Sequence, residues 1–435
     1  MFRNRNQTKI WAALLGAMFL APAILFADQE TVSLDQLIGE LVKNNPQIQA
    51  AESRYQAAAA RPSQMRTLPD PVVSFVSRNG SGNPLPFTEL GKDPLSSVGL
   101  MWEQELPYPG KLKLAGKIGE KEAASVQAEI DVVRWTVIAQ LKQAFFEYFR
   151  ADRTLEILRE SLDLLKRFEQ IAESRYSVGE AIQQDVLRAQ VEISILSQRI
   201  TSLEQERASA AAEINRLLNR PVEAPIPKPA AVTASSFSET AEKLQQEYLL
   251  KAPMIRSTEA MLQREKLGLD LAKKQYRPDF MTSVEYANSP DFPDMWEIEF
   301  GLRIPIFYKK KQAYGVVEAT NNLSRAEKDL TATKQEVSFS IKNEWLQIQA
   351  SEKLLMLYSD AIIPQSNLAL ESSIASYQVG KADFLTTLSN FLTVLEYRMN
   401  YFEELAKHES AVARLEQAVG RPIASNIPAG GQENE

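Results

Sequence analysis

The most informative feature of this 435-residue sequence is what it lacks. It has no cysteine, which excludes disulfides, thiolate metal sites, a catalytic thiol and a lipid-modified cysteine anchor. With a single histidine, His408, it has no multi-histidine metal site. His408 stands in a charged stretch between Glu404 and Glu409, so we expect a surface imidazole without a catalytic role. Since no nucleophile–base pair, phosphate-binding loop or metal-ligand cluster is found either, we expect neither a cofactor nor enzymatic activity.

Proline and glycine are scarce, and their distribution predicts very long helices. No proline occurs in the 111 residues from Gly110 to Arg220, which are rich in Ala, Glu, Gln, Leu and Arg. Apolar residues recur at alternating steps of three and four through 126–165 and again through 182–203. This is the spacing of a coiled-coil seam, and the break at Gly179 predicts two antiparallel helices joined there.

The first 27 residues read as a signal peptide. A basic start with Arg3, Arg5 and Lys9 precedes an apolar core over 10–26 and a cleavage site after Ala27. An N-terminal membrane anchor is the alternative. Removing this segment leaves 46 basic against 56 acidic residues, an acidity that argues against a nucleic-acid partner. No later run of 18 or more apolar residues predicts a membrane-spanning helix.

The chain consists of two tandem copies of one unit. The motif at Tyr176 to Gly179 returns at Tyr377 to Gly380, and an Arg-Pro pair follows each glycine at the same distance. We therefore divide the chain as follows: signal peptide 1–27, first repeat 28–222 with a helical hairpin over 111–219, proline-rich linker 221–238, second repeat 239–423 with a hairpin over 310–419, and disordered tail 424–435.

Each repeat also carries two segments with the two-residue period of β-strands. These strands are expected near 72–78, 97–106, 279–287 and 296–304, and each has about the length that crosses a bilayer when tilted. The apolar face is expected to meet lipid and the polar face to line water, although a soluble sheet half buried on a core remains the alternative. The expected lipid-facing aromatic residues are Trp102, Tyr286 and Trp296, and the expected luminal residues are Glu103, Glu105, Glu285, Glu297, Glu299 and Arg303.

Four strands cannot close a barrel by themselves, and lipid does not tolerate an open sheet edge. Several copies must therefore share one barrel. Two copies would give eight strands and an interior filled by side chains, whereas three would give twelve strands and a lumen.

This plan resembles the TolC-like outer-membrane efflux proteins over essentially all of 34–423, most specifically in the stretch from Gly179 to Gln190. The resemblance implies a mainly α fold with a small transmembrane β part: antiparallel coiled-coil hairpins forming an α-barrel, and four strands per protomer in a shared trimeric twelve-stranded barrel. It also implies a homotrimer in the outer-membrane lipid of a Gram-negative bacterium. The implied partners are a periplasmic adaptor (membrane fusion protein) and an inner-membrane pump such as an RND transporter. Proteins of this family are conduits.

The same resemblance implies that the hairpin tips close the entrance and dock the adaptor. The tip residues it designates are Tyr176, Gly179, Asp185, Tyr377, Gly380 and Asp383. Both tyrosines are equally compatible with ordinary packing in the helical seam. The chain departs from some relatives by having Thr386 and Ser389 where those carry paired aspartates. The segment 104–111 is similar to the branch that serves heavy-metal pumps. A type I secretion channel, a soluble periplasmic scaffold or adaptor, and an enzyme on a helical scaffold remain alternatives.

Overall fold

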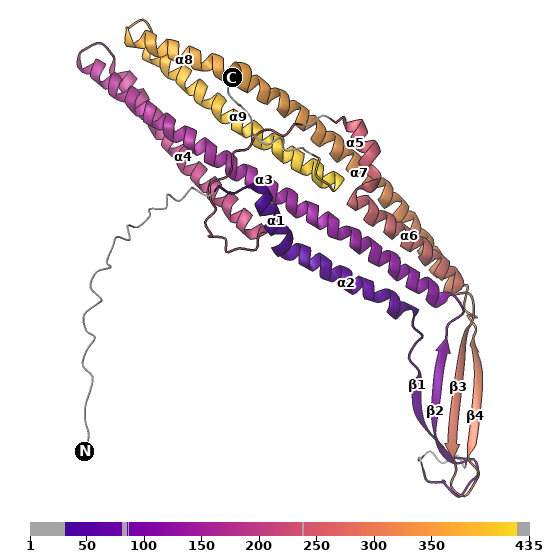
Figure 1. Cartoon of the computed structure of the whole chain (residues 1–435). Helices are drawn as coiled ribbons and strands as arrows, with labels where there is room; N and C mark the ends of the chain where they lie inside the picture. The colour runs from indigo at the N-terminus through magenta and orange to yellow at the C-terminus, as the bar shows by residue number, and fades with distance from the viewer. Residues whose placement is uncertain (1–30, 81–84, 86, 237–238, 424–435) are drawn as a thin grey trace, which may run out of the picture.

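A computed structural model describes residues 31–80, 85, 87–236 and 239–423. These residues form a long, mainly helical body with a four-stranded sheet at one end and two helical hairpin tips at the other (Figure 1). The expected signal peptide 1–27 and tail 424–435 lie outside the described residues. Among the helices of the described part, none combines the length and the apolar character needed to cross a membrane.

The two repeats have the same order of elements, with two or more short helices, two strands and a long hairpin in each. The first repeat comprises α1 (Leu34–Asn44), α2 (Pro46–Arg66), β1 (Val72–Arg78), β2 (Ser97–Leu106), α3 (Lys111–Ser177) and α4 (Gln183–Leu217). The second comprises α5 (Ala241–Tyr248), η1 (Leu249–Lys251), α6 (Pro253–Lys274), β3 (Asp279–Asn288), β4 (Met295–Arg303), α7 (Gln312–Leu357), η2 (Tyr358–Ile362), α8 (Ile363–Gln378) and α9 (Phe384–Val419).

Helix α3 is the central element of the body. Its 67 residues extend for about 100 Å at 1.5 Å per residue. It contacts α2 and α6 in its sheet-proximal half, and α4 and α9 in its tip-proximal half. Leu155, Leu158 and Leu165 of its seam are at most 1% exposed and pack in one apolar core with residues of α4, α8 and α9. The regular seam predicted from the sequence is therefore buried between hairpins.

The second hairpin is interrupted where the first is continuous. A π-helical turn, η2, separates α7 from α8. Pro364 follows directly in the first turn of α8. Proline lacks the backbone N–H and its ring clashes with the carbonyl group four residues earlier, so a wider turn at this point relieves the clash. The first hairpin contains no proline and keeps a single long helix.

The four strands form one antiparallel sheet in the order β1-β2-β3-β4. The register places Trp102 opposite Val284, and Glu285 opposite Glu297. Directly opposed residues project from the same face of a sheet. Within the described residues, β1 and β4 each have only one neighbouring strand, so both outer edges of the sheet are open. The expected fold class, mainly helical with four antiparallel strands, is confirmed.

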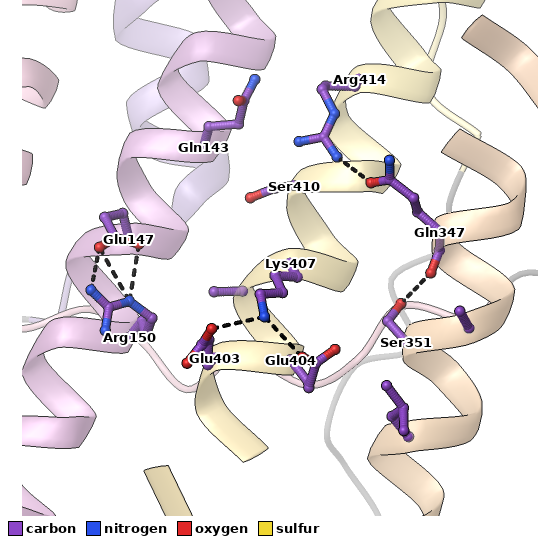
Figure 2. Close-up of a pocket in the computed structure, with 13 residues that line it drawn as sticks. Gln143, Glu147, Arg150, Gln347, Ser351, Glu403, Glu404, Lys407, Ser410 and Arg414 are labelled. Carbon is purple, nitrogen blue, oxygen red and sulfur yellow. Dashed lines mark hydrogen bonds and ion pairs between the residues drawn. The ribbon is translucent and has the colours of Figure 1, made fainter. Parts of the chain in front are cut away.

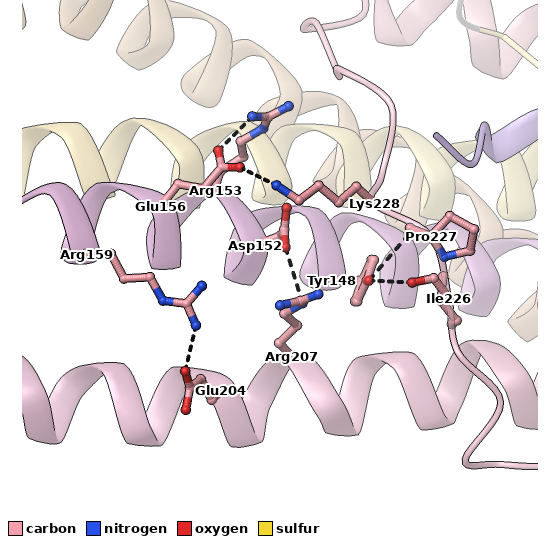
Figure 3. Close-up of polar contacts among 10 residues, drawn as sticks. All are labelled: Tyr148, Asp152, Arg153, Glu156, Arg159, Glu204, Arg207, Ile226, Pro227 and Lys228. Atoms are coloured by element: carbon pink, nitrogen blue, oxygen red, sulfur yellow. Dashed lines mark hydrogen bonds and ion pairs between the residues drawn. The ribbon is translucent and has the colours of Figure 1, made fainter. Parts of the chain in front are cut away.

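The linker between the repeats crosses the middle of the helical body (Figure 3). It meets the N-terminal segment through a short parallel bridge between Val32 and Pro229. The hydroxyl group of Tyr148 on α3 donates to the carbonyl oxygen of Ile226 at 3.2 Å, and Lys228 pairs with Glu156 at 3.2 Å. An extended, proline-rich segment is thereby held on the helices by hydrogen bonds to its carbonyl groups.

His408 anchors the last part of this linker, and our expectation of a surface imidazole is wrong. Its side chain is 0% exposed. Nε2 lies 2.9 Å from the carbonyl oxygen of Ser235, and Nδ1 lies 2.9 Å from the hydroxyl oxygen of Ser351. Since a carbonyl oxygen only accepts, Nε2 carries a proton. The prediction relied on the charged residues next to His408 in the sequence. It failed because other parts of the fold cover α9 on more than one side at this point.

We expect His408→Ala to destabilise the fold by about 2 to 4 kcal/mol, because it leaves a cavity and removes the hydrogen-bond partner of the Ser235 carbonyl group. The free energy of unfolding would be measured by chemical denaturation in detergent, followed by circular dichroism. Lys407→Ala is the matched control, since Lys407 forms only ion pairs at the surface with Glu403 and Glu404 and should cost less than about 1 kcal/mol. Equal losses in both variants would contradict the anchoring role.

Candidate functional site

The two hairpin tips are built in the same way. Gly179 and Gly380 have positive φ angles of 83° and 74°. Each glycine N–H donates to the carbonyl oxygen three residues earlier, on Tyr176 at 3.0 Å and on Tyr377 at 3.1 Å. A Cβ atom built on Gly179 would meet nothing within 4 Å. The requirement for glycine at this tip is therefore conformational, since left-handed backbone is unfavourable for residues with a side chain.

The two tip tyrosines occupy different environments. Tyr377 is 5% exposed and its ring makes an edge contact with Phe384, with ring centroids 5.8 Å apart. Tyr176 is 46% exposed. The seam interpretation thus describes Tyr377, which belongs to the core between the hairpins, whereas the side chain of Tyr176 is available for contact with another molecule.

Arg175 connects the two tips and was missed by the sequence analysis. From α3 its Nη1 donates to the carbonyl oxygen of Tyr377 at 2.8 Å, and its guanidinium carbon lies 4.9 Å from the centroid of the Tyr377 ring. It also lies 3.6 Å from the carboxylate of Glu180. The only feature of the sequence that could have drawn attention to Arg175 is its position directly before the repeated Tyr motif. The equivalent position in the second repeat is Ser376. The tip contact is therefore asymmetric between repeats.

Asp185 and Asp383 also lie at this contact. Asp383 caps α9 by accepting a hydrogen bond from the N–H of Thr386 at 2.6 Å. The hydroxyl group of Thr386, together with this N–H, lowers the pKa of Asp383. Asp185 lies in the first turn of α4. Burial raises the pKa of Asp185, and the charge of Asp383 raises it further. The two predicted aspartates are thus brought together and repel each other when both are ionised.

The sheet separates the other predicted residues onto two faces. One face carries Trp102, Tyr286 and Trp296, and the other carries the predicted acidic residues and Arg303. On the aromatic face Phe300 is 83% exposed and Ile298 is 63% exposed. Tyr286 and Trp296 form a pair, with ring centroids 5.1 Å apart. Trp102 lies opposite Val284, two residues along β3 from the Tyr286–Trp296 pair.

Arginines balance part of the acidic face. Glu285 is 4% exposed and lies directly opposite Glu297, an arrangement that repels. Arg78 reaches from β1 across β2 to relieve it: its Nη2 lies 2.7 Å from Glu285 and 3.7 Å from Glu297. Arg303 pairs with Glu105 at 2.5 Å. The side chain of Glu285 is thus buried and its negative charge is balanced by Arg78, whereas the side chain of Glu297 is 66% exposed.

A groove of about 810 Å³ lies between α3, α9 and α7 (Figure 2). Charged side chains line it, but they pair with one another. Glu147 binds Arg150, and Lys407 binds Glu403 and Glu404. Among the described residues, no group of three or more His, Cys, Asp or Glu side chains could hold a metal ion. The charged side chains that line this groove are therefore already paired with one another.

Comparisons with known proteins agree with this architecture. The family profile described as "Outer membrane efflux protein" matches residues 37–220. The chain is 20% identical over 317 residues to the cobalt-zinc-cadmium resistance protein CzcC of Cupriavidus metallidurans, covering 72% of this chain and 74% of CzcC. It is 21% identical to the pyoverdine export outer membrane protein OpmQ of Pseudomonas putida, covering 82% and 78%. The structure of the outer membrane protein VceC from Vibrio cholerae superposes with a TM-score of 0.76 at 17% identity, covering 90% of this chain and 96% of VceC.

The raised pKa of Asp185 makes the tip contact sensitive to pH. A carboxyl group with a raised pKa holds its proton to higher pH in the packed tips than in separated ones, so the packed arrangement gains stability as pH falls and loses it as pH rises. Because the chain has no cysteine, spin labels can be placed at Ser177→Cys and Gln378→Cys alone. Their distance distribution should shorten from about pH 7 to about pH 4. In Asp185→Asn the distance should stay short at every pH, whereas in the control Asp163→Asn it should change with pH as in the wild type. A distance distribution that still changes with pH in Asp185→Asn would exclude Asp185 as the titrating group.

Proposed function

The chain belongs to the outer membrane efflux protein family, and on that premise we propose that three copies form a passive conduit for efflux across the outer membrane. The strands cross the membrane and the helical body extends into the periplasm. This family consists of transport channels, and we infer that the chain catalyses no reaction of its own.

The observation that carries the proposal is the sheet with two open edges and an exposed apolar face. Four strands leave β1 and β4 with unpaired backbone groups, which lipid does not tolerate. Pairing β4 of one copy with β1 of the next closes a barrel of twelve strands when three copies take part. A soluble scaffold would instead expose Phe300 and Ile298 to water. The aromatic face therefore fits lipid and the acidic face fits a water-filled lumen.

We assign adaptor docking and closure of the entrance to the two tips. Tyr176 offers an exposed ring, while Gly179 and Gly380 fix the turns. Arg175, Asp185 and Asp383 lie where the tips meet, so a change in their contacts would separate the tips. The proposed partners are a periplasmic adaptor and an inner-membrane pump such as an RND transporter.

The oligomer is the first test of the proposal. Native mass measurement of the full chain in mild detergent should give a trimer, and the trimer should form discrete pores in planar lipid bilayers. A monodisperse monomer would contradict the shared barrel. A trimer that inserts but never conducts would contradict the conduit.

The exposed glutamates of the acidic face should make the pore prefer cations. Threefold symmetry turns Glu297 and Glu299 into rings, and closely spaced carboxylates raise the local cation concentration within a Debye length of about 8 to 10 Å. Glu297→Gln with Glu299→Gln should lower the permeability ratio of K⁺ to Cl⁻, measured from reversal potentials under a KCl gradient at low salt. The control removes Glu52 and Glu223, which lie outside the strands, and should leave the ratio unchanged.

If the double variant behaves as the control, these glutamates only keep a wetted surface polar. A cation preference would fit a cationic cargo. The name of CzcC refers to resistance to cobalt, zinc and cadmium, and divalent metal ions are accordingly the cargo that we propose.

A further inference from the structure

A pocket of about 510 Å³ lies where the end of β4 meets the start of α7. In Figure 1 this is the junction between the sheet and the helical body. We call it the junction pocket; its lining includes Arg277, Asp279, Arg303, Phe307, Lys311 and Gln312. Its volume is in the range of small-molecule sites.

Lys311 and Arg277 line the junction pocket, and Lys309 and Lys310 directly precede Lys311 in the sequence. Lys309, Lys310 and Lys311 are exposed, and none of them has an ion pair within the part of the chain that the structure describes; the same holds for Arg277. The equivalent junction of the first repeat differs. There Lys111 is 5% exposed and its Nζ lies 2.7 Å from Asp279, which is thereby already engaged. The second repeat therefore presents positive charge that the fold itself does not use.

Apolar side chains border these cations. Ile304 is 61% exposed, Ile306 is 70% exposed and Phe307 is 72% exposed, all in the segment between β4 and the three lysines. A strip of apolar side chains followed by lysines matches the boundary between acyl chains and headgroups, where lysine stems lie along apolar surface and their ammonium groups reach the polar layer.

The wall of the pocket contains one polar group without a partner. Oε1 of Gln312 is buried and accepts no hydrogen bond within the described residues. The two ends of an amide side chain are assigned from their partners, so this group can present either an acceptor or a donor to a ligand. Gln312 stands next to Lys311 in sequence, and both line the pocket.

We propose that the junction pocket binds the headgroup of an anionic phospholipid in the periplasmic leaflet of the outer membrane. This rests on the proposed function, which places the strands in that membrane. Lys311 and Arg277 bind the phosphate group from the pocket wall, and the exposed Lys309 and Lys310 add positive charge next to it. Gln312 bonds the polar headgroup, and the acyl chains follow Ile304, Ile306 and Phe307. Basic pockets beside membrane-embedded segments are typical sites for anionic headgroups.

A neighbouring copy is the competing occupant of this surface. In the proposed barrel, β4 faces the start of β1 of the next copy. The segment 67–71 that precedes β1 offers a single carboxylate, Asp70, against four cations, and the charge of Arg66 next to it is balanced by Glu120. Charge complementarity therefore favours a lipid phosphate over the protein neighbour.

The test uses the full chain as a detergent-solubilised trimer, so that failure to form a trimer counts against the proposed function and not against lipid binding. Native mass spectrometry would compare binding of dioleoylphosphatidylglycerol with that of dioleoylphosphatidylcholine. The wild type should bind phosphatidylglycerol more tightly by about tenfold or more, since each lysine near an anionic headgroup contributes about 1 kcal/mol. Glycerol phosphate, which has the headgroup charge without acyl chains, should bind far more weakly.

The variant Lys309→Gln/Lys310→Gln/Lys311→Gln should lose the preference for phosphatidylglycerol while remaining a trimer. The control Lys166→Gln/Lys328→Gln/Lys353→Gln removes the same charge from α3 and α7 away from the junction and should retain the preference. Equal binding of the two lipids by the wild type, or equal loss in both variants, would overturn the proposal. Protection of the three lysines from acetylation in the lipid-free trimer would also overturn it, because the neighbouring copy would then cover the pocket.

Discussion

The apolar seam of α3 is the interaction on which the rest of the molecule depends. One helix of 67 residues packs against α2 and α6 near the sheet and against α4 and α9 near the tips. Because α2, α4, α6 and α9 pack against α3, and α7 packs in turn against α6 and α9, α3 fixes both the place of the strands and the place of the tips. The burial of residues such as Leu155 and Leu165 supplies this stabilisation without any disulfide.

Polar contacts determine the position of the linker and the contact between the tips, which apolar packing alone does not fix. His408 and Tyr148 hold the linker on the helical body, and Arg175 holds one tip against the other. These bonds involve buried or half-buried groups whose loss leaves a partner unsatisfied, so each specifies one arrangement more strongly than a surface ion pair would. The linker contacts are suited to a permanent scaffold. The tip contacts include the repelling pair Asp185 and Asp383, which suits a contact that opens.

The sheet meets a different constraint, since its edges and its apolar face are incomplete in a single chain. In the proposed trimer, association with other copies and with lipid would satisfy both requirements at once, and the exposed glutamates would line the lumen. The junction between sheet and helices concentrates charge in the same way: the first repeat neutralises Lys111 internally, whereas the second leaves three lysines exposed at the level where headgroups would lie.

Periodic features of the fold followed from the sequence alone, because a repeated spacing needs no knowledge of distant contacts. The seam of α3, the alternation in β4 and the repeated glycine turns at Gly179 and Gly380 are of this kind. Tertiary structure alone decided the burial of His408, the bridging role of Arg175 and the pairing of Arg78 with Glu285. Each of these joins residues separated by more than 50 positions, and an isolated charged or polar residue carries no period from which its partner can be inferred. Whether such a residue is exposed or buried depends on which helix or strand the fold places beside it.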